Sequence, residues 1–136
     1  MSHDFAFWDA DEPLESDEAG EVYAALTERG ASDQVRPSPK IALLAREIES
    51  RWPIPSSGQE DEWPLAAPPD LSAAHLIVCI VPSRLRDVWP ALGEFAKTHE
   101  LVMYDPQQSH VFLPPRLSRK RTRARAKAKQ QRPPGP

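Results

Sequence analysis

The sequence is poor in the residues that build cross-links and nucleotide sites. Cys79 is the only cysteine, which excludes an internal disulfide and any cysteine cluster around a metal. Five glycines stand against 16 prolines, which indicates stiff, extended connections. No glycine-rich loop precedes a helical pattern, so the sequence also lacks a phosphate-binding motif. These absences exclude several common classes of cofactor site.

Long apolar runs are missing as well. No stretch approaches the roughly 20 apolar residues that a transmembrane helix needs. The first residues, Met1-Ser2-His3-Asp4, lack the basic and apolar regions of a secretory signal. We therefore expect a cytoplasmic protein without a membrane segment. The 136 residues, 40% of them hydrophobic, are enough for one folded domain.

No local pattern indicates catalysis. His75 and Cys79 share a predicted strand but lie about 13 Å apart at roughly 3.3 Å per residue, too far for a catalytic pair. Cys79 lies within an apolar run, where a thiol is normally an inert packing residue. The four histidines have no spacing typical of metal ligands. We predict a non-enzymatic protein without a cofactor or metal. A third possibility is an enzyme whose site combines distant residues, such as Glu94, Asp105 and His110.

The clearest folded segment spans residues 72–107. An apolar run at 74–81, a helical pattern from about 85 to 98 and a second apolar run at 101–104 predict a strand, a helix and another strand. The first run does not alternate with polar residues, so we expect both of its faces to be covered. Asp87 is the predicted N-cap of the helix, because Pro90 would then lie in its first turn.

The flanking segments complete an α+β pattern. Residues 4–9 alternate like a strand, and Ser16 precedes a helical pattern that stops at Gly30. Ser38 and Pro39 begin a second helix, and short strands are predicted at 63–67 and 110–113. This order predicts a small mixed or antiparallel sheet with about three helices packed on one face. Residues 1–115 form a single α+β domain in this interpretation, followed by a disordered basic tail at 116–136.

The net charge of −3 conceals two regions of opposite sign. Residues 116–136 contain nine Lys or Arg and no acid, whereas residues 1–115 hold all 20 acids and have a net charge of −12. One interpretation is a solvated acidic face. The other is a surface for a basic protein partner, with Trp63 as an apolar anchor. The residues predicted for this surface are Asp9, Asp11, Glu12, Glu60, Asp61, Glu62 and Trp63.

The basic tail supports an alternative function. Lysine and arginine side chains contact the phosphates of nucleic acids, which makes the tail a candidate nucleic-acid contact. It has no aromatic residue, so we expect weak specificity. A competing interpretation is that the tail folds back on the acidic body, and its Arg/Lys/Ala alternation at 121–129 is compatible with a helix on an anionic partner. The candidate contacts are Arg119, Lys120, Arg121, Arg123 and Arg125.

Several segments together resemble a group of small bacterial single-domain proteins that begin with a short strand ending in Trp and end with an apolar strand followed by Tyr-Asp-Pro-Gln. The segments are Phe5-Ala6-Phe7-Trp8-Asp9, the helix between Pro39 and Pro53, Ser83-Arg84 ahead of Val88-Trp89-Pro90, and Leu101-Val102-Met103-Tyr104-Asp105-Pro106-Gln107. Some members look like immunity proteins, the cognate inhibitors of toxins used in bacterial competition. The resemblance covers about residues 4–113 and brings no catalytic residue. It implies an immunity-type inhibitor, which would neutralise a toxin through the acidic surface.

Overall fold

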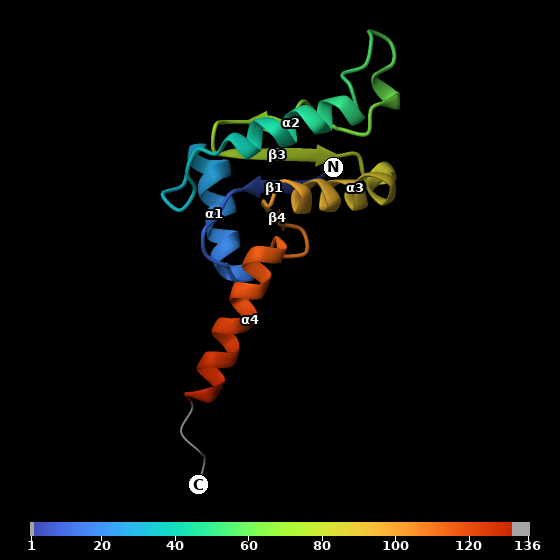
Figure 1. Cartoon of the computed structure of the whole chain (residues 1–136). Coiled ribbons are helices and arrows are strands. Elements are labelled where there is room, and N and C mark those ends of the chain that lie inside the picture. The colour runs from blue at the N-terminus through green and yellow to red at the C-terminus, as the bar shows by residue number, and fades with distance from the viewer. Residues whose placement is uncertain (1, 132–136) are drawn as a thin grey trace.

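A computed structural model describes residues 2–131 and confirms the α+β class. Its sheet is antiparallel, with the strand order β2-β3-β1-β4-β5 (Figure 1). The strands are β1 (His3–Trp8), β2 (Asp70–Leu71), β3 (His75–Ile80), β4 (Val102–Asp105) and β5 (His110–Phe112). The helices are α1 (Ser16–Arg29), α2 (Pro39–Arg51), α3 (Leu85–Thr98) and α4 (Pro115–Gln130), with 3₁₀ turns η1 (Glu60–Glu62) and η2 (Pro82–Arg84).

The first strand of the chain lies in the middle of the sheet. β1 pairs with β3 on one side and with β4 on the other, so the β3-α3-β4 unit encloses it. Phe5 and Phe7 point to one face of the sheet, whereas Ala6 and Trp8 point to the other. All four are buried, because both faces of this strand are covered.

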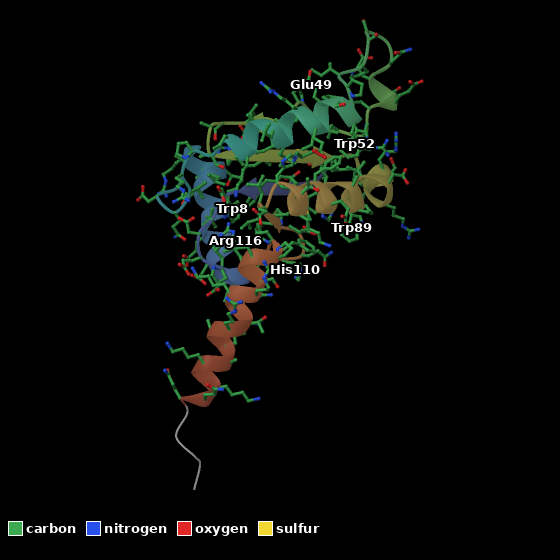
Figure 2. All side chains as sticks on the ribbon, viewed as in Figure 1. Trp8, Glu49, Trp52, Trp89, His110 and Arg116 are labelled. Carbon is green, nitrogen blue, oxygen red and sulfur yellow. The ribbon has the colours of Figure 1, made fainter. Side chains whose placement is uncertain are left out.

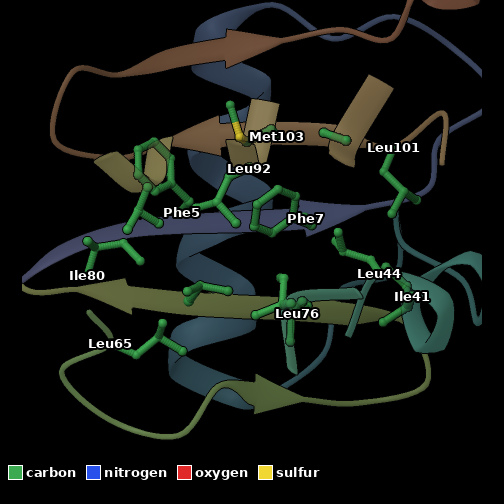
Figure 3. Packing of buried hydrophobic residues seen from close by; sticks show 14 residues of the cluster. Phe5, Phe7, Ile41, Leu44, Leu65, Leu76, Ile80, Leu92, Leu101 and Met103 are labelled. Carbon is green, nitrogen blue, oxygen red and sulfur yellow. The ribbon is translucent and has the colours of Figure 1, made fainter. Parts of the chain in front are cut away.

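The helices divide between the two faces of the sheet, so the prediction that they pack on one face is wrong. α2 and α3 cover the face with Phe5 and Phe7, and Figure 3 shows this core with α1 behind the sheet. α1 and α4 cover the face with Ala6 and Trp8. The physical reason is that β1, β3 and β4 carry apolar side chains on both faces, and each face needs its own cover.

Local signals placed the C-terminal end of α1 and the start of α2 correctly. Ser38 is the N-cap of α2, its hydroxyl accepts the Lys40 amide at 3.3 Å, and Pro39 is the first helical residue. Gly30 ends α1 with a φ of 72°, a left-handed conformation that glycine adopts without strain. The N-cap of α1 is Glu15 and not the predicted Ser16, which is the first helical residue, because Glu15 forms a capping box with Glu18.

The start of α3 differs from the prediction. The helix begins at Leu85, directly after η2, so Asp87 lies inside the helix and is not its N-cap. Pro90 is therefore an interior helix residue. It is exposed, and the carbonyl that loses its helical partner can be hydrated from that side.

The predicted edge strands of the sheet are confirmed only in part. β5 lies within the predicted strand at 110–113 and forms a hairpin with β4. At the other edge the segment 63–67 makes only a single bridge, between Leu65 and Ile80, and the short β2 completes the pairing with β3. The predicted strand at 63–67 is thus reduced to one residue pair.

The basic segment after Pro114 is a helix over most of its length, which corrects the prediction of a disordered tail for residues 116–130. The side chain of Leu117 is 0% exposed and belongs to the core that contains Trp8 and Tyr104. The domain therefore extends past the predicted boundary at residue 115. The outer turns of α4, from Thr122 onward, are exposed and project from the body (Figure 1). The last part of the predicted tail, residues 132–136, lies outside the described residues.

Candidate partner-binding surfaces

The first acidic segment, residues 9–15, is largely neutralised within the chain. Asp9 is buried, accepts a hydrogen bond from the Ser38 hydroxyl at 3.0 Å, and lies 3.6 Å from the Lys40 ammonium and 4.0 Å from the Arg116 guanidinium. A carboxylate in this position organises the start of α2 and has little surface to offer a partner. The prediction that Asp9 lies on a binding surface is therefore corrected.

Exposed acids of the same segment also have cationic partners. Arg36 donates to Asp11 at 2.6 Å, Lys120 to Glu12 at 2.6 Å, and Arg125 to Glu15 at 2.7 and 2.9 Å. Two of these three cations come from α4, which thus acts as the anionic segment's own counter-charge. Of the tail residues predicted to contact phosphates, Lys120 and Arg125 are engaged here. Among residues 2–131, no ion pair involves Arg119, Arg121 or Arg123.

The second acidic segment is a protruding loop at residues 53–63, here called the acidic loop (Figure 1). Glu60, Asp61 and Glu62 form η1, and all three are exposed. Within residues 2–131 none of these carboxylates forms an ion pair. Hydrogen bonds from the Glu60 and Gly58 backbone amides lower the pKa of the Glu60 carboxyl. The acidic loop is therefore a compact source of negative charge at neutral pH.

Backbone contacts hold the acidic loop against the domain. The Trp63 indole donates to the Trp52 carbonyl at 3.1 Å, at the end of α2 (Figure 2). Arg84 donates to the Glu62 carbonyl at 3.2 Å, so this guanidinium supports the loop's backbone and forms its ion pair with Asp87. Trp63 is half-buried and part of this anchor. The sequence singled it out as a contact residue, and the structure shows that it also positions the loop.

An apolar hollow of about 150 Å³ lies beside the acidic loop. Trp52, Trp63, Ile48 and Leu76 are among the residues that line it. Two of its lining side chains, Ile54 and Leu71, are 68% and 53% exposed. Neither was predicted as a site residue. Each is an isolated apolar residue among prolines or polar residues, so neither belongs to an apolar pattern in the sequence. Only the fold brings the two side chains together.

The two acidic regions lie at opposite ends of the molecule, with the acidic loop far from the α1–α4 side (Figure 1). The predicted partner surface is therefore two surfaces. Glu60, Asp61, Glu62 and Trp63 belong to the acidic loop, whereas Asp9, Asp11 and Glu12 belong to the neutralised segment beside α4.

Ser72, His75 and Asp70 are arranged like the nucleophile, the base and the acid of a catalytic triad. The Ser72 hydroxyl lies 2.8 Å from His75 Nδ1, and His75 Nε2 lies 3.4 Å from Asp70. However, the same hydroxyl accepts the amides of Ala74 and His75 at 3.1 and 3.0 Å. This is the hydrogen-bonding pattern of a turn, here the one between β2 and β3, and it accounts for the position of the Ser72 hydroxyl.

The Tyr-Asp-Pro-Gln segment has a structural role at the β4–β5 turn. Asp105 is buried, accepts the Gln107 and Gln108 amides, and lies 3.1 Å from His3 Nε2. The Gln107 side chain bonds both the amide and the carbonyl of Asp4, which extends the pairing of β1 and β4. Asp105 and His110 are cross-strand partners, while Glu94 pairs with Lys97 on α3. The carboxylate of Asp105 is thus committed to the turn and to His3.

Tyr23 and Cys79 both have raised pKa values, and the Asp4 carboxylate near the start of β1 contributes to both shifts. Burial and the adjacent Asp4 carboxylate raise the pKa of Tyr23 to about 12. Burial and the same carboxylate raise the pKa of the Cys79 thiol to about 11. Cys79 is therefore a protonated thiol at neutral pH, which suits a packing residue and disfavours a nucleophile.

Two further findings concern the part of the chain that the structure describes. Within it, no helix combines the length and the apolar character needed to cross a bilayer. No group of three or more His, Cys, Asp or Glu side chains in residues 2–131 is arranged to hold a metal ion.

Comparison of the chain with family models, with curated proteins and with solved structures finds no match. The resemblance to immunity proteins stays a prediction from the sequence.

Proposed function

We propose that this chain is a non-enzymatic binding protein, an immunity-type inhibitor that neutralises a basic protein toxin through the acidic loop. The proposal rests on charged and apolar groups that lie together at one end of the domain. Glu60, Asp61 and Glu62 are exposed and form no ion pair within residues 2–131. Beside them lie the exposed side chains of Ile54 and Leu71 and the apolar hollow that these two line. A charged rim around an apolar centre is the usual anatomy of a protein–protein interface.

Each part of this surface has its own role in binding. The carboxylates of Glu60, Asp61 and Glu62 attract a basic partner and raise the association rate. Ile54 and Leu71 then lose their water against the partner, and this burial slows dissociation. The hydrogen bonds from Trp63 and Arg84 hold the loop before binding, which reduces the conformational entropy lost in the complex.

The toxin as partner rests on the sequence resemblance. A protruding acidic loop is well shaped to enter a cleft lined by cations, such as the substrate site of an enzyme that acts on anionic polymers. Occupation of such a cleft would block the enzyme without any chemistry by the inhibitor. Basic proteins of this kind are the class of partner that the loop's charge would select.

The charge prediction is tested with a triple variant and a matched control. The triple variant carries Glu60→Lys, Asp61→Lys and Glu62→Lys, which reverse the charge of the acidic loop. The control carries the same three reversals at exposed acids of the opposite end, Glu21, Glu28 and Asp33. Full-length proteins capture partners from native host lysate after nuclease treatment, and a captured basic protein is purified for binding kinetics. We expect the loop variant to lower the association rate at least about tenfold and to fail to protect cells that express the captured protein. The control should match the wild type.

The apolar part is tested separately. Ile54→Ala should raise the dissociation rate of the same complex, while Leu43→Ala, which truncates an exposed leucine of α2, should not. Equal kinetics for the loop variant, the control variant and the wild type would show that the partner uses another surface. A captured protein that neither harms cells nor is neutralised would leave a binding protein without the immunity role.

A further inference from the structure

A second hollow lies at the other edge of the sheet, between α3, β5 and the first turns of α4. It has a volume of about 520 Å³, and both helices and the edge strand contribute lining residues. Figure 2 shows Trp89 on α3, and His110 beside the beginning of α4. We call this feature the α3–α4 groove. It exists only because α4 docks on the domain through Leu117, so no sequence segment shows it alone.

Three rings gather in the α3–α4 groove. The Trp89 side chain is 41% exposed, and its ring centroid lies 6.4 Å from that of Phe112. The His110 ring lies 4.4 Å from Phe112 in an edge-on arrangement. His110 is exposed and Phe112 half-buried, so water reaches part of this cluster. A tryptophan on the outer side of a helix contributes little to the core and is well suited to stack against a flat ligand.

Two cations line the α3–α4 groove together with these rings, Lys97 and Arg121. Arg119 and Arg123 lie two residues before and after Arg121, on other faces of α4. Glu94 also lines it and lies 3.7 Å from Lys97, which leaves the charge of Arg121 uncompensated there. Among residues 2–131, no acid pairs with Arg119, Arg121 or Arg123. The outer turns of α4 continue the positive charge away from the groove.

We propose that the α3–α4 groove binds a single-stranded nucleic acid. An unpaired base would stack on Trp89 beside Phe112 and His110, while Lys97 and Arg121 contact the phosphates. A positive track beside exposed aromatic rings is the combination that single-strand binding uses. An acidic peptide would satisfy the cations but offers no flat faces for the rings, and a duplex hides its bases. The basic tail alone lacked an aromatic residue, and the fold supplies three.

The test measures binding of a fluorescein-labelled oligothymidylate of roughly 12 nucleotides, within the site sizes of single-strand binding folds. Fluorescence anisotropy of the full-length protein gives the affinity at several salt concentrations. Trp89→Ala should weaken binding at least about fivefold, the lower end of what one base–aromatic stack contributes. Trp89→Phe should retain most of the affinity. Leu43→Ala removes a similarly exposed apolar side chain from α2 and should have no effect.

The charges are tested by matched pairs of neutral substitutions. Lys97→Gln with Arg121→Gln should reduce the slope of log K against log salt by about 1.4, the value for two phosphate contacts on a single strand. Arg46→Gln with Arg51→Gln removes the same charge from α2, away from the α3–α4 groove, and should leave the slope unchanged.

Each alternative outcome overturns the proposal in a distinct way. Equal affinity of wild type and Trp89→Ala, with a duplex of the same length bound as tightly, would show attraction by charge alone. No binding of oligothymidylate, but binding of polyglutamate, would assign the α3–α4 groove to an acidic protein. Circular dichroism and the unfolding midpoint of each variant should match the wild type, so a loss of affinity is not mistaken for unfolding.

Discussion

The two acidic regions of this protein have similar compositions and different environments. Residues 9–15 contain Asp9, Asp11, Glu12 and Glu15, and all four lie close to cations, three of which belong to α4. Residues 60–62 contain three acids in a row, and none has such a partner within residues 2–131. The difference shows that acidic composition does not identify a binding surface. Charges that the fold leaves unpaired are the ones available to a partner.

The same difference indicates which acidic region supports the fold and which one is available to bind a partner. Neutralisation of the first region lets α4, with eight Lys or Arg among its 16 residues, dock on the domain through Leu117. The acids of the second region are exposed and stay available to a partner. We therefore expect changes in the first region to affect stability and changes in the second to affect binding. The following predictions test this division.

The largest effect is expected at the anchor of α4. Leu117→Ala should lower the free energy of unfolding by about 2–5 kcal/mol, because it leaves a cavity in the core cluster that contains Trp8 and Tyr104. Urea unfolding of the full chain measures it. Leu43→Ala, at a 49% exposed position of α2, is the matched control and should change stability by about 0.5 kcal/mol or less. Equal small effects for both variants would show that α4 does not dock, and the neutralisation of residues 9–15 would then fall with it.

An intermediate effect is expected from the acids themselves. Asp9→Asn should cost about 1–3 kcal/mol, because the amide replaces a buried carboxylate that accepts the Ser38 hydroxyl and faces two cations. Asp61→Asn in the acidic loop should change stability by no more than about 0.5 kcal/mol. Thermal or urea unfolding of the two variants side by side measures the contrast. Similar costs at both positions would contradict the division between the two regions.

The sequence predicted the features that depend on neighbouring residues. Ser38 with Pro39 begins α2, Gly30 ends α1, and the apolar runs become β3 and β4, because caps, turns and strand burial are determined within a few positions. The α+β class followed from the order of these elements. The start of α3 was misplaced, since a helix continuing from a 3₁₀ turn tolerates Pro90 on its exposed side.

The features that depend on distant contacts were missed. Leu117 is one apolar residue in a basic segment and gives no periodic signal, and the partner of Lys120 is Glu12, 108 positions earlier in the chain. The burial of Asp9 could not be distinguished from the exposure of Asp11 by composition. Half of the predicted surface, Glu60 to Trp63, lies on one loop, but Ile54, Leu71 and the α3–α4 groove emerge only from the packing of separate elements.

The smallest effect concerns the order of the acidic loop. The backbone amides of Glu60 and Gly58 donate to the Glu60 carboxylate, the latter at 3.0 Å, and lower its pKa below the ordinary value of 4.5. A carboxyl whose pKa is lower in the folded state stabilises the fold above the ordinary pKa, and this contribution is lost as the pH falls through the lowered one. Carbon-13 NMR titration of the glutamate carboxyls, in native protein and in urea, should therefore give a lower midpoint for Glu60 in the native state. Equal midpoints would mean that the loop is not held in this conformation, and a partner would then meet three carboxylates that must be ordered on binding. The contrast between the two regions would become one between an ordered, neutralised segment and an unordered, charged one.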